Sequence, residues 1–237
     1  KKLLLPIQEN QEKQTSFIAT ASHEFRTPLA IMHSCLTAFR SADPEIKEQF
    51  LQTMEKENRR LSSLVNDMLL LTQVSGRSLS VSMSETELDT LLLNSYEEFL
   101  PLAREKGLRL FIKLPEQRIP PCLCDAGRLS QVLGILISNA VSYCNKNGYI
   151  KLALSISHSR FFLTVEDNGI GISETAKPHI FERFYREDSS RNKQEHFGLG
   201  LCIAKEIIDF HHGHITVSDT PGGGTTFTIS LPIRKQI

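Results

Sequence analysis

The sequence predicts an α+β protein, in which a helical hairpin over residues 1–77 precedes an α/β sandwich domain over residues 78–237. Two observations carry this prediction. Up to about Gly76, apolar residues recur every three or four positions, which is the period of packed helices. From about Ser84 onward, strand-like alternation of apolar and polar residues is interspersed with helical stretches, a pattern typical of helices packed on one face of a mixed sheet.

The first region carries two apolar stripes, with Ser22 and Glu57 each filling one slot that would otherwise be apolar. Asp43, Pro44 and Glu45 separate the stripes and are typical of a helix start. Because two amphipathic helices bury little surface alone, we expect a second copy to complete a four-helix bundle. The stripes comprise Ile18, Phe25, Leu29, Met32, Leu36 and Phe39, then Ile46, Phe50, Met54, Leu61, Leu64, Met68 and Leu71.

The second region is predicted to alternate between helices and strands. Its first helix is expected to open with a capping box at residues 84–87 and to end near Gly107. The remaining elements are a strand at 108–114, a helix capped by Asp125 and running to about Tyr143, strands within 150–156 and 161–165, a helix at 199–211, and a strand pair at 215–217 and 227–231.

Composition excludes several classes of function. Apolar residues make up 40% and charged residues 23% of the chain, and the net charge is zero, so no broad basic surface for nucleic acid is expected. The five cysteines are scattered and lack zinc-finger spacing, which favours reduced thiols. No apolar run approaches the ~18 residues that a bilayer crossing needs, and no secretory signal is visible.

Two glycine-rich motifs are candidates for ligand binding. The first, DNGIG at 167–171, follows an expected strand, where a carboxylate can accept a hydrogen bond from an exocyclic amine such as that of adenine. Its glycines permit close backbone approach, although a turn without a ligand is the competing interpretation. The second, GLGL at 198–201, opens an expected helix, whose free N–H groups suit an anionic phosphate.

Two further side chains are candidates for metal binding and for nucleophilic attack. Asn139, late on the helix that follows Asp125, offers a hard oxygen that suits Mg²⁺. His23 flanks the first apolar stripe and should face solvent, where neutral imidazole is a competent nucleophile. Glu24 and Thr27 beside it supply an acceptor and a hydroxyl. A lone surface histidine is usually inert, so His23 and its neighbours indicate a function only together with the other motifs.

In combination, six motifs resemble those of the sensor histidine kinases of bacterial two-component systems, and they cover about residues 15 to 234. The segment SHEFRTPL at 22–29 resembles the H-box that carries the phosphorylated histidine, and 131–143 is similar to the N-box. The four remaining matches are DNGIGI at 167–172, IFERFYR at 180–186, GLGL at 198–201 and GGGTTF at 222–227. The resemblance implies a dimerisation and phosphotransfer hairpin followed by a Bergerat-type ATP-binding domain.

The resemblance also implies roles for individual residues. His23 would attack the γ-phosphate of ATP with assistance from Glu24, and Thr27 would position water for dephosphorylation of a regulator. Asp167 would hold the adenine amino group, Asn139 would ligate Mg²⁺, and residues 181–200 would form a mobile lid. The implied nucleotide-binding residues are Asn139, Tyr143, Asp167, Gly169, Gly171, Arg186, Gly198, Leu199 and Gly200.

One position departs from the resemblance in a way that bears on activity. Ile135 stands where the N-box usually carries a second polar ligand, and its side chain can neither bind a metal nor hydrogen-bond phosphate. A weakly active or inactive docking module that acts mainly as a regulator phosphatase is therefore an alternative to the active kinase. A stand-alone ATPase related to chaperones or mismatch-repair proteins is a third hypothesis, but it does not explain the hairpin.

The partners implied by the resemblance are a response-regulator receiver domain, whose aspartate would take the phosphoryl group from His23, and a second copy of the chain. No nucleic-acid partner is expected. The resemblance further implies transmembrane segments upstream of Lys1, so we expect this stretch to be a soluble portion on the cytoplasmic side of a bacterial inner membrane.

Overall fold

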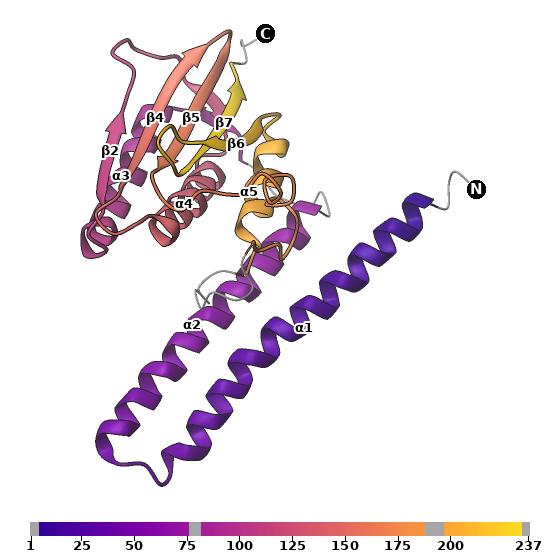
Figure 1. Cartoon of the computed structure of the whole chain (residues 1–237). Helices are drawn as coiled ribbons and strands as arrows, with labels where there is room; N and C mark the ends of the chain where they lie inside the picture. Colours follow the sequence, from indigo (N-terminus) through magenta and orange to yellow (C-terminus); the bar gives the residue numbers. More distant parts are fainter. Residues whose placement is uncertain (1–4, 76–81, 188–196, 234–237) are drawn as a thin grey trace. The chain divides into compact units, whose positions relative to one another are not determined.

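The computed structural model describes residues 5–75, 82–187 and 197–233 (Figure 1). The chain forms two compact units, which are described separately. One unit comprises residues 1–72 with 183–199, and the other comprises residues 73–182 with 200–237. The predicted fold class, a helical hairpin followed by an α/β sandwich, is confirmed. The predicted boundary between residues 77 and 78 lies outside the described residues.

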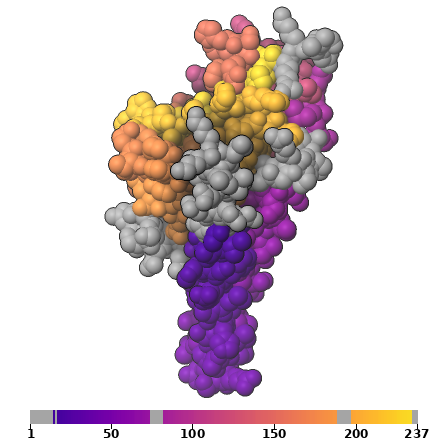
Figure 2. Space-filling model, turned by 90° about the vertical axis from the view of Figure 1, so that its right-hand side faces the viewer, coloured from indigo at the N-terminus to yellow at the C-terminus, as the bar shows by residue number. Residues whose placement is uncertain are grey.

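The hairpin consists of α1 (Leu5–Phe39) and α2 (Pro44–Ser75). A short turn separates them, and α2 begins where the sequence predicts, with the Lys47 N–H donating to the Asp43 carbonyl at 3.0 Å. Proline suits this first helical position because its fixed φ is helical and its missing N–H has no partner there. The violet part of Figure 2 shows surface of the hairpin near this turn.

Packing inside the hairpin differs from the predicted stripes. Among the side chains of the first helix that the structure describes, the buried ones are Ala21, Pro28 and Cys35, which are spaced by seven residues and therefore share one face. Leu64 and Leu71 of the second stripe are buried as predicted, but Leu29 and Leu36 of the first are 53% and 57% exposed. The single chain thus leaves a row of large apolar side chains uncovered.

The second unit contains a five-stranded mixed sheet with strand order β2-β4-β5-β7-β6. Strands β2 and β4 are parallel, and the other neighbours are antiparallel. The strands are β2 (Arg109–Lys113), β4 (Tyr149–Ser157), β5 (Arg160–Asp167), β6 (His214–Asp219) and β7 (Thr225–Pro232). Figure 1 shows the long strands β4, β5 and β7 side by side.

The core lies between this sheet and three helices, α3 (Leu88–Glu105), α4 (Ala126–Tyr143) and α5 (Gly200–Phe210). Every second residue of β5 is buried, and the register aligns these residues with buried ones on neighbouring strands, so that Leu154, Leu163 and Ile229 form one row. Such alternation is expected where only one face of a sheet is covered. Within residues 5–75, 82–187 and 197–233, no helix combines the length and hydropathy that a membrane crossing requires.

Local sequence signals misplaced one element and located another correctly. The predicted capping box at 84–87 is wrong, because Ser84–Thr86 form a strand, β1, that pairs antiparallel with β3 (Cys122–Cys124). Helix α3 begins only at Leu88, and its N-cap Glu87 makes no side-chain cap hydrogen bond. In α4, Asp125 caps as predicted, since its Oδ1 accepts from the Arg128 N–H at 3.0 Å.

Candidate functional site

Among the described residues of the second unit, a deeply buried acidic group lies at the end of β5. The strand alternates between buried and half-buried residues, and Asp167 continues its buried face with a residue exposure of 4%. Its Oδ1 accepts hydrogen bonds from the backbone N–H of Gly169 at 2.8 Å and of Thr225 at 3.3 Å. In the part of the chain that the structure describes, both donors thus reach Oδ1, which leaves Oδ2 available to a ligand.

The electrostatics of Asp167 suit a ligand that donates hydrogen bonds. Burial raises the pKa of Asp167 above its usual value, and the nearby Glu166 adds to this, while the N–H groups of Gly169 and Thr225 partly offset it. A carboxylate in such a place is under-solvated. A donor on a bound ligand would therefore stabilise its charged form.

The turn after Asp167 is held against the end of α4. The Ile170 N–H donates to the Tyr143 carbonyl at 3.3 Å, and a side chain at Gly169 would collide with that same carbonyl. Gly171 has a positive φ of 74°, a conformation that glycine adopts without strain. The structure thus brings Tyr143, Gly169 and Gly171 together with Asp167.

Sequence reasoning missed two residues of this site. Gly224, with φ of 113°, lies so close to Asp167 that a side chain there would overlap the Asp167 carbonyl. Thr225, the next residue, is 6% exposed and donates its N–H to Asp167. The glycine run before Thr225 was the available signal, but only the pairing of β5 with β7 shows that it faces Asp167.

Asn168 fixes the same turn to the neighbouring strand. Its Oδ1 accepts from the Tyr149 N–H at 2.6 Å, at the start of β4, and lies 3.3 Å from the Cys144 Sγ. The Asn145 side-chain amide donates to the Asn168 carbonyl at 3.4 Å. Because the Asn168 Oδ1 and carbonyl make these structural contacts, Asn168 fixes the turn in place, and Asp167 remains as the ligand-binding group of the turn.

Helix α4 presents the predicted metal ligand and its unusual neighbour. Asn139 is half-buried on this helix. Ile135, one turn earlier, packs against the start of α5, where a Cβ placed on Gly200 would lie 3.1 Å from its Cγ2. Gly200 is thereby brought next to α4. The apolar side chain of Ile135 occupies the position in which a second polar ligand was expected.

The remaining predicted nucleotide-binding residues belong to the other compact unit. Gly198 has φ of 73°, its carbonyl accepts from the Phe184 N–H at 2.9 Å, and a Cβ on it would lie 2.7 Å from the Tyr185 carbonyl oxygen. Leu199 is buried and Arg186 is half-buried. Both lie in segments grouped with the hairpin. The middle of the predicted lid, residues 188–196, lies outside the described residues.

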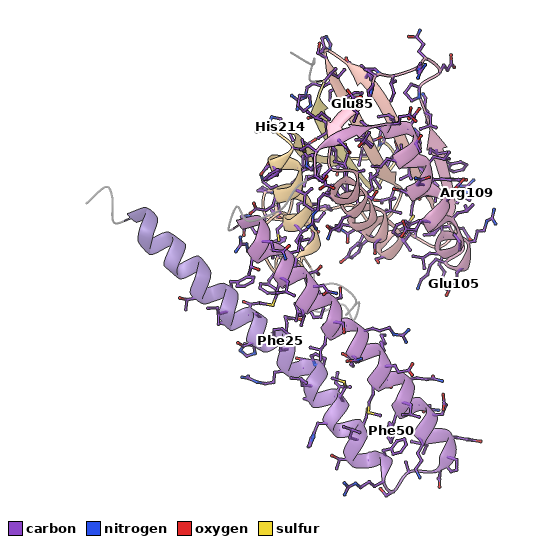
Figure 3. The ribbon with its side chains drawn as sticks, turned by 180° about the vertical axis from the view of Figure 1, so that it is seen from behind. Phe25, Phe50, Glu85, Glu105, Arg109 and His214 are labelled. Carbon is purple, nitrogen blue, oxygen red and sulfur yellow. The ribbon has the colours of Figure 1, made fainter. Side chains whose placement is uncertain are left out.

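The predicted phosphoacceptor lies on the surface of α1. His23 and Thr27 are exposed, and the Thr27 hydroxyl donates to the His23 carbonyl at 3.4 Å. Glu24 is half-buried, and the next residue, Phe25, is labelled in Figure 3. An exposed imidazole offers a ring nitrogen to an incoming electrophile and remains reachable by a partner protein.

The chain thus combines a hairpin that carries an exposed histidine with an α/β domain that carries a buried carboxylate at a glycine turn. Both parts match known protein-family models. Residues 13–77 match the His Kinase A (phospho-acceptor) domain. Residues 124–235 match the histidine kinase-, DNA gyrase B- and HSP90-like ATPases.

Curated relatives match this chain over almost its whole length. The chain is 35% identical to the sensor histidine kinase RppB of a Synechocystis strain, over 96% of this chain and 51% of the relative. It is 34% identical to the sensor protein CiaH of Streptococcus pneumoniae, over 97% of this chain and 52% of the relative. The chain therefore spans about half the length of these relatives.

Solved structures of histidine kinases are also similar to this chain. The histidine kinase AdeS of Acinetobacter baumannii is 25% identical, with a TM-score of 0.70 over 90% of this chain and 98% of that one. The full-length ShkA complex with AMPPNP is 28% identical, with a TM-score of 0.69 over 90% of this chain and 45% of that one. The chain belongs to the sensor histidine kinase family.

Proposed function

We propose that this chain is the catalytic portion of a histidine kinase, which phosphorylates its own His23 from ATP and passes the phosphoryl group to an aspartate of a response regulator. The observation that carries the proposal is the buried Asp167, whose Oδ2 is left for a ligand donor beside a turn that only glycine can form. The exposed His23 in the same chain supplies the acceptor.

Asp167 would recognise the adenine base of ATP. Its Oδ2 can accept a hydrogen bond from the exocyclic amine, and a carboxylate acceptor makes this bond stronger than a neutral one. Gly169 approaches the Tyr143 carbonyl, and Gly224 the Asp167 carbonyl, so closely that neither position has room for a side chain beside this carboxylate. The structural relative ShkA was solved with AMPPNP, an ATP analogue, which supports a nucleotide at this fold position.

The donor set on α4 fits Mg²⁺ with few protein ligands. Magnesium is usually held by one or two protein oxygens together with substrate phosphates and water, and Asn139 offers one such oxygen. Ile135 offers none, and the described residues contain no group of three or more His, Cys, Asp and Glu side chains that could hold a metal. Bound there, Mg²⁺ would neutralise phosphate charge.

The hairpin would supply the nucleophile and the proton acceptor. A lone pair of the His23 imidazole forms a bond to the γ-phosphorus while the bond from that phosphorus to the oxygen of the ADP leaving group breaks. The phosphorylated ring then loses the proton on its other nitrogen, and Glu24 is the neighbouring carboxylate that accepts it. The exposed Thr27 hydroxyl would position a water molecule when the regulator is dephosphorylated.

Assembly follows from the uncovered apolar row of the hairpin. We propose that residues 1–77 dimerise with a second copy, because Ile18, Leu29 and Leu36 are each more than half exposed in one chain. Residues 78–237 would form the catalytic domain, and Arg186, Gly198 and Leu199 would join its nucleotide site. A receiver domain would dock on the hairpin around His23, on the cytoplasmic side of a bacterial membrane.

A second candidate function rests on Ile135. Its contact with Gly200 places a methyl group where the family usually has a polar ligand. A chain that binds ATP but transfers phosphate poorly would then act mainly as a docking module and regulator phosphatase. The two functions differ in one observable, which is the rate at which wild-type protein takes up phosphate from ATP.

Incubation with γ-³²P-labelled ATP and Mg²⁺ tests the proposal. We expect acid-labile, alkali-stable label on the wild-type chain and none on His23→Gln. The matched control is His33→Gln, because His33 is also an exposed histidine of α1 and should label normally. Label retained in His23→Gln refutes the assignment of the nucleophile, and ATP binding without label on wild-type protein favours the docking module.

A further inference from the structure

A cluster of three charged side chains lies inside the hairpin. The Arg60 guanidinium on α2 is 3.6 Å from Glu24 Oε2 on α1, through Nη2, and 3.5 Å from Glu57 Oε2, through Nη1. The side chains of Arg60 and Glu57 are only 9% and 6% exposed, and that of Glu24 is 31% exposed. The carboxylate next to His23 is therefore turned toward the second helix.

This cluster is poorly satisfied. Within the described part of the chain, the Nε and Nη1 atoms of Arg60 and the Oε2 of Glu57 are buried without hydrogen-bond partners. Both ion pairs are longer than a charge-assisted hydrogen bond, and one guanidinium faces two carboxylates. Because buried charges gain most of their stability from good geometry and complete hydrogen bonding, this cluster is less stabilising than a well-paired one.

An aromatic ring covers the free face of the guanidinium. Phe197, which precedes the second glycine motif, lies with its ring centroid 4.7 Å from Arg60 Cζ and is 4% exposed. The ring excludes water from one side of the cluster, which strengthens the attraction of Arg60 for the carboxylates. Nearby, the Phe184 ring packs at a tilt against that of Phe17 of α1, with centroids 5.3 Å apart. These pairs join the described ends of the 183–199 segment to the hairpin.

We propose that Arg60 is a positioning residue, which holds the Glu24 carboxylate away from His23 while Phe197 covers the Arg60 guanidinium. Displacement of Phe197 then frees the Glu24 carboxylate to assist phosphorylation of His23. The inference rests on the proposed function. When Phe197 leaves, water reaches the guanidinium and screens its pair with Glu24. Because Phe197 is adjacent to the glycines expected to bind phosphate, its position ties the availability of the proton acceptor to nucleotide binding.

The test measures initial autophosphorylation rates over a range of ATP concentrations for Phe197→Leu, which removes the ring but keeps an apolar side chain. We expect kcat to rise about five-fold, the factor by which loss of a partly exposed ion pair shifts an equilibrium. The same substitution combined with Glu24→Gln should leave the low rate of Glu24→Gln unchanged. A purely structural role would change both backgrounds alike.

A second variant guards against misfolding at position 197. Arg60→Gln combined with Glu57→Gln removes the guanidinium without leaving Glu57 buried and unpaired, and it too should raise kcat only when Glu24 is present. The matched control is Arg59→Gln, because Arg59 pairs with Glu55 at 3.7 Å on the exposed side of the same helix. It should label at the wild-type rate, and circular dichroism confirms folding of every variant.

The outcomes separate the two claims. If wild-type protein is labelled but neither folded Phe197→Leu nor the folded combination of Arg60→Gln with Glu57→Gln has a higher kcat than wild type, the inference alone is overturned. A rise in kcat that persists in the Glu24→Gln background also overturns it, because the effect would not pass through Glu24. Wild-type protein that takes no label refutes the proposed kinase function, and the inference fails with it.

Discussion

The hairpin and the α/β domain carry their functional groups in opposite ways. None of the 13 glycines of the chain precedes residue 76, and the domain uses Gly171 and Gly224 at positive φ to build its site. The domain also closes its own core, with Phe161 and Leu163 almost fully buried, whereas the hairpin leaves Leu29 and Leu36 more than half exposed.

The difference follows from what each region must contact. A small ligand needs a pocket in which the backbone can approach closely, so the site of the domain depends on main-chain conformation and one buried carboxylate. A phosphoacceptor must be reached by an ATP site and by a partner protein, so its groups lie on the surface of a regular helix. Substitutions should therefore act through folding and pocket shape in the domain, and through association and chemistry in the hairpin.

The largest effect is expected from truncating the closed core. Leu163→Ala should lower the free energy of unfolding by about 2–5 kcal/mol, because it removes buried contacts and leaves a cavity. Urea denaturation at low protein concentration measures this. Leu36→Ala is the matched change in the hairpin, where we expect a loss below about 0.5 kcal/mol in the protomer and weaker self-association. Equal losses at both positions would contradict the comparison.

Removing the charge of Asp167 should act on ligand binding. Asp167→Asn keeps an oxygen for the Gly169 and Thr225 N–H groups but replaces Oδ2 with an NH2 group that cannot accept from adenine, which should lower ATP affinity about 10- to 100-fold. Isothermal titration calorimetry measures the change. The matched control is Asp209→Asn, an exposed aspartate paired with Lys205 at 2.7 Å, which should bind ATP normally. Unchanged affinity in Asp167→Asn would remove Asp167 from the site.

Two glycines in one loop sharpen the role of backbone geometry. Gly222 and Gly224 both have positive φ, of 92° and 113°, but a side chain at 222 meets open space while one at 224 meets Asp167. Gly224→Ala should therefore be destabilised by about 1–3 kcal/mol more than Gly222→Ala, and should also bind ATP more weakly. Thermal denaturation in parallel measures the difference, and the two variants melting together would count against it.

The smallest effect concerns a carboxylate of the hairpin. Burial raises the pKa of Asp67 from its ordinary 3.8 to about 6. The folded state therefore holds this proton more tightly than the unfolded state, so its contribution to stability is present below pH 4 and is lost as pH rises through about 6. Asp67→Asn should stabilise the protein at pH 7 by about 1–2 kcal/mol, allowing for solvent screening.

Comparison of unfolding at pH 4 and pH 7 checks this prediction, because the gain should shrink at the lower pH. Burial raises the pKa of Asp167 in the same direction, so Asp167→Asn should also gain stability at neutral pH while losing ATP affinity. Asp67→Asn should gain stability without that loss. A stability gain for Asp67→Asn that is independent of pH would show that Asp67 is not the titrating group.

Much of this architecture was predictable because it is encoded locally. Helical periodicity located the hairpin, and alternation located β4 and β5. The position of Asp167 at the end of an alternating strand indicated a site. The capping box at 84–87 failed because the pairing of Ser84–Thr86 with Cys122–Cys124 is not visible in local sequence.

The rest depends on contacts between distant residues. Thr225 reaches Asp167 only because β7 pairs with β5, 58 residues away in sequence. Glu57 was visible as a charged residue in an apolar stripe, but its neighbours Arg60 and Glu24 belong to two helices whose facing sides depend on packing. The sequence stripes also could not show which of their residues a single chain would bury.

The central claim is that the nucleotide site of the domain delivers phosphate to one side chain of the hairpin. Mass spectrometry of wild-type protein after incubation with Mg²⁺-ATP, by electron-transfer fragmentation at neutral pH, tests it most directly. The account predicts a single phosphate on the imidazole of His23. Phosphate on His33, Ser22 or Thr27 in place of His23 would contradict it, as would an unmodified chain that binds ATP.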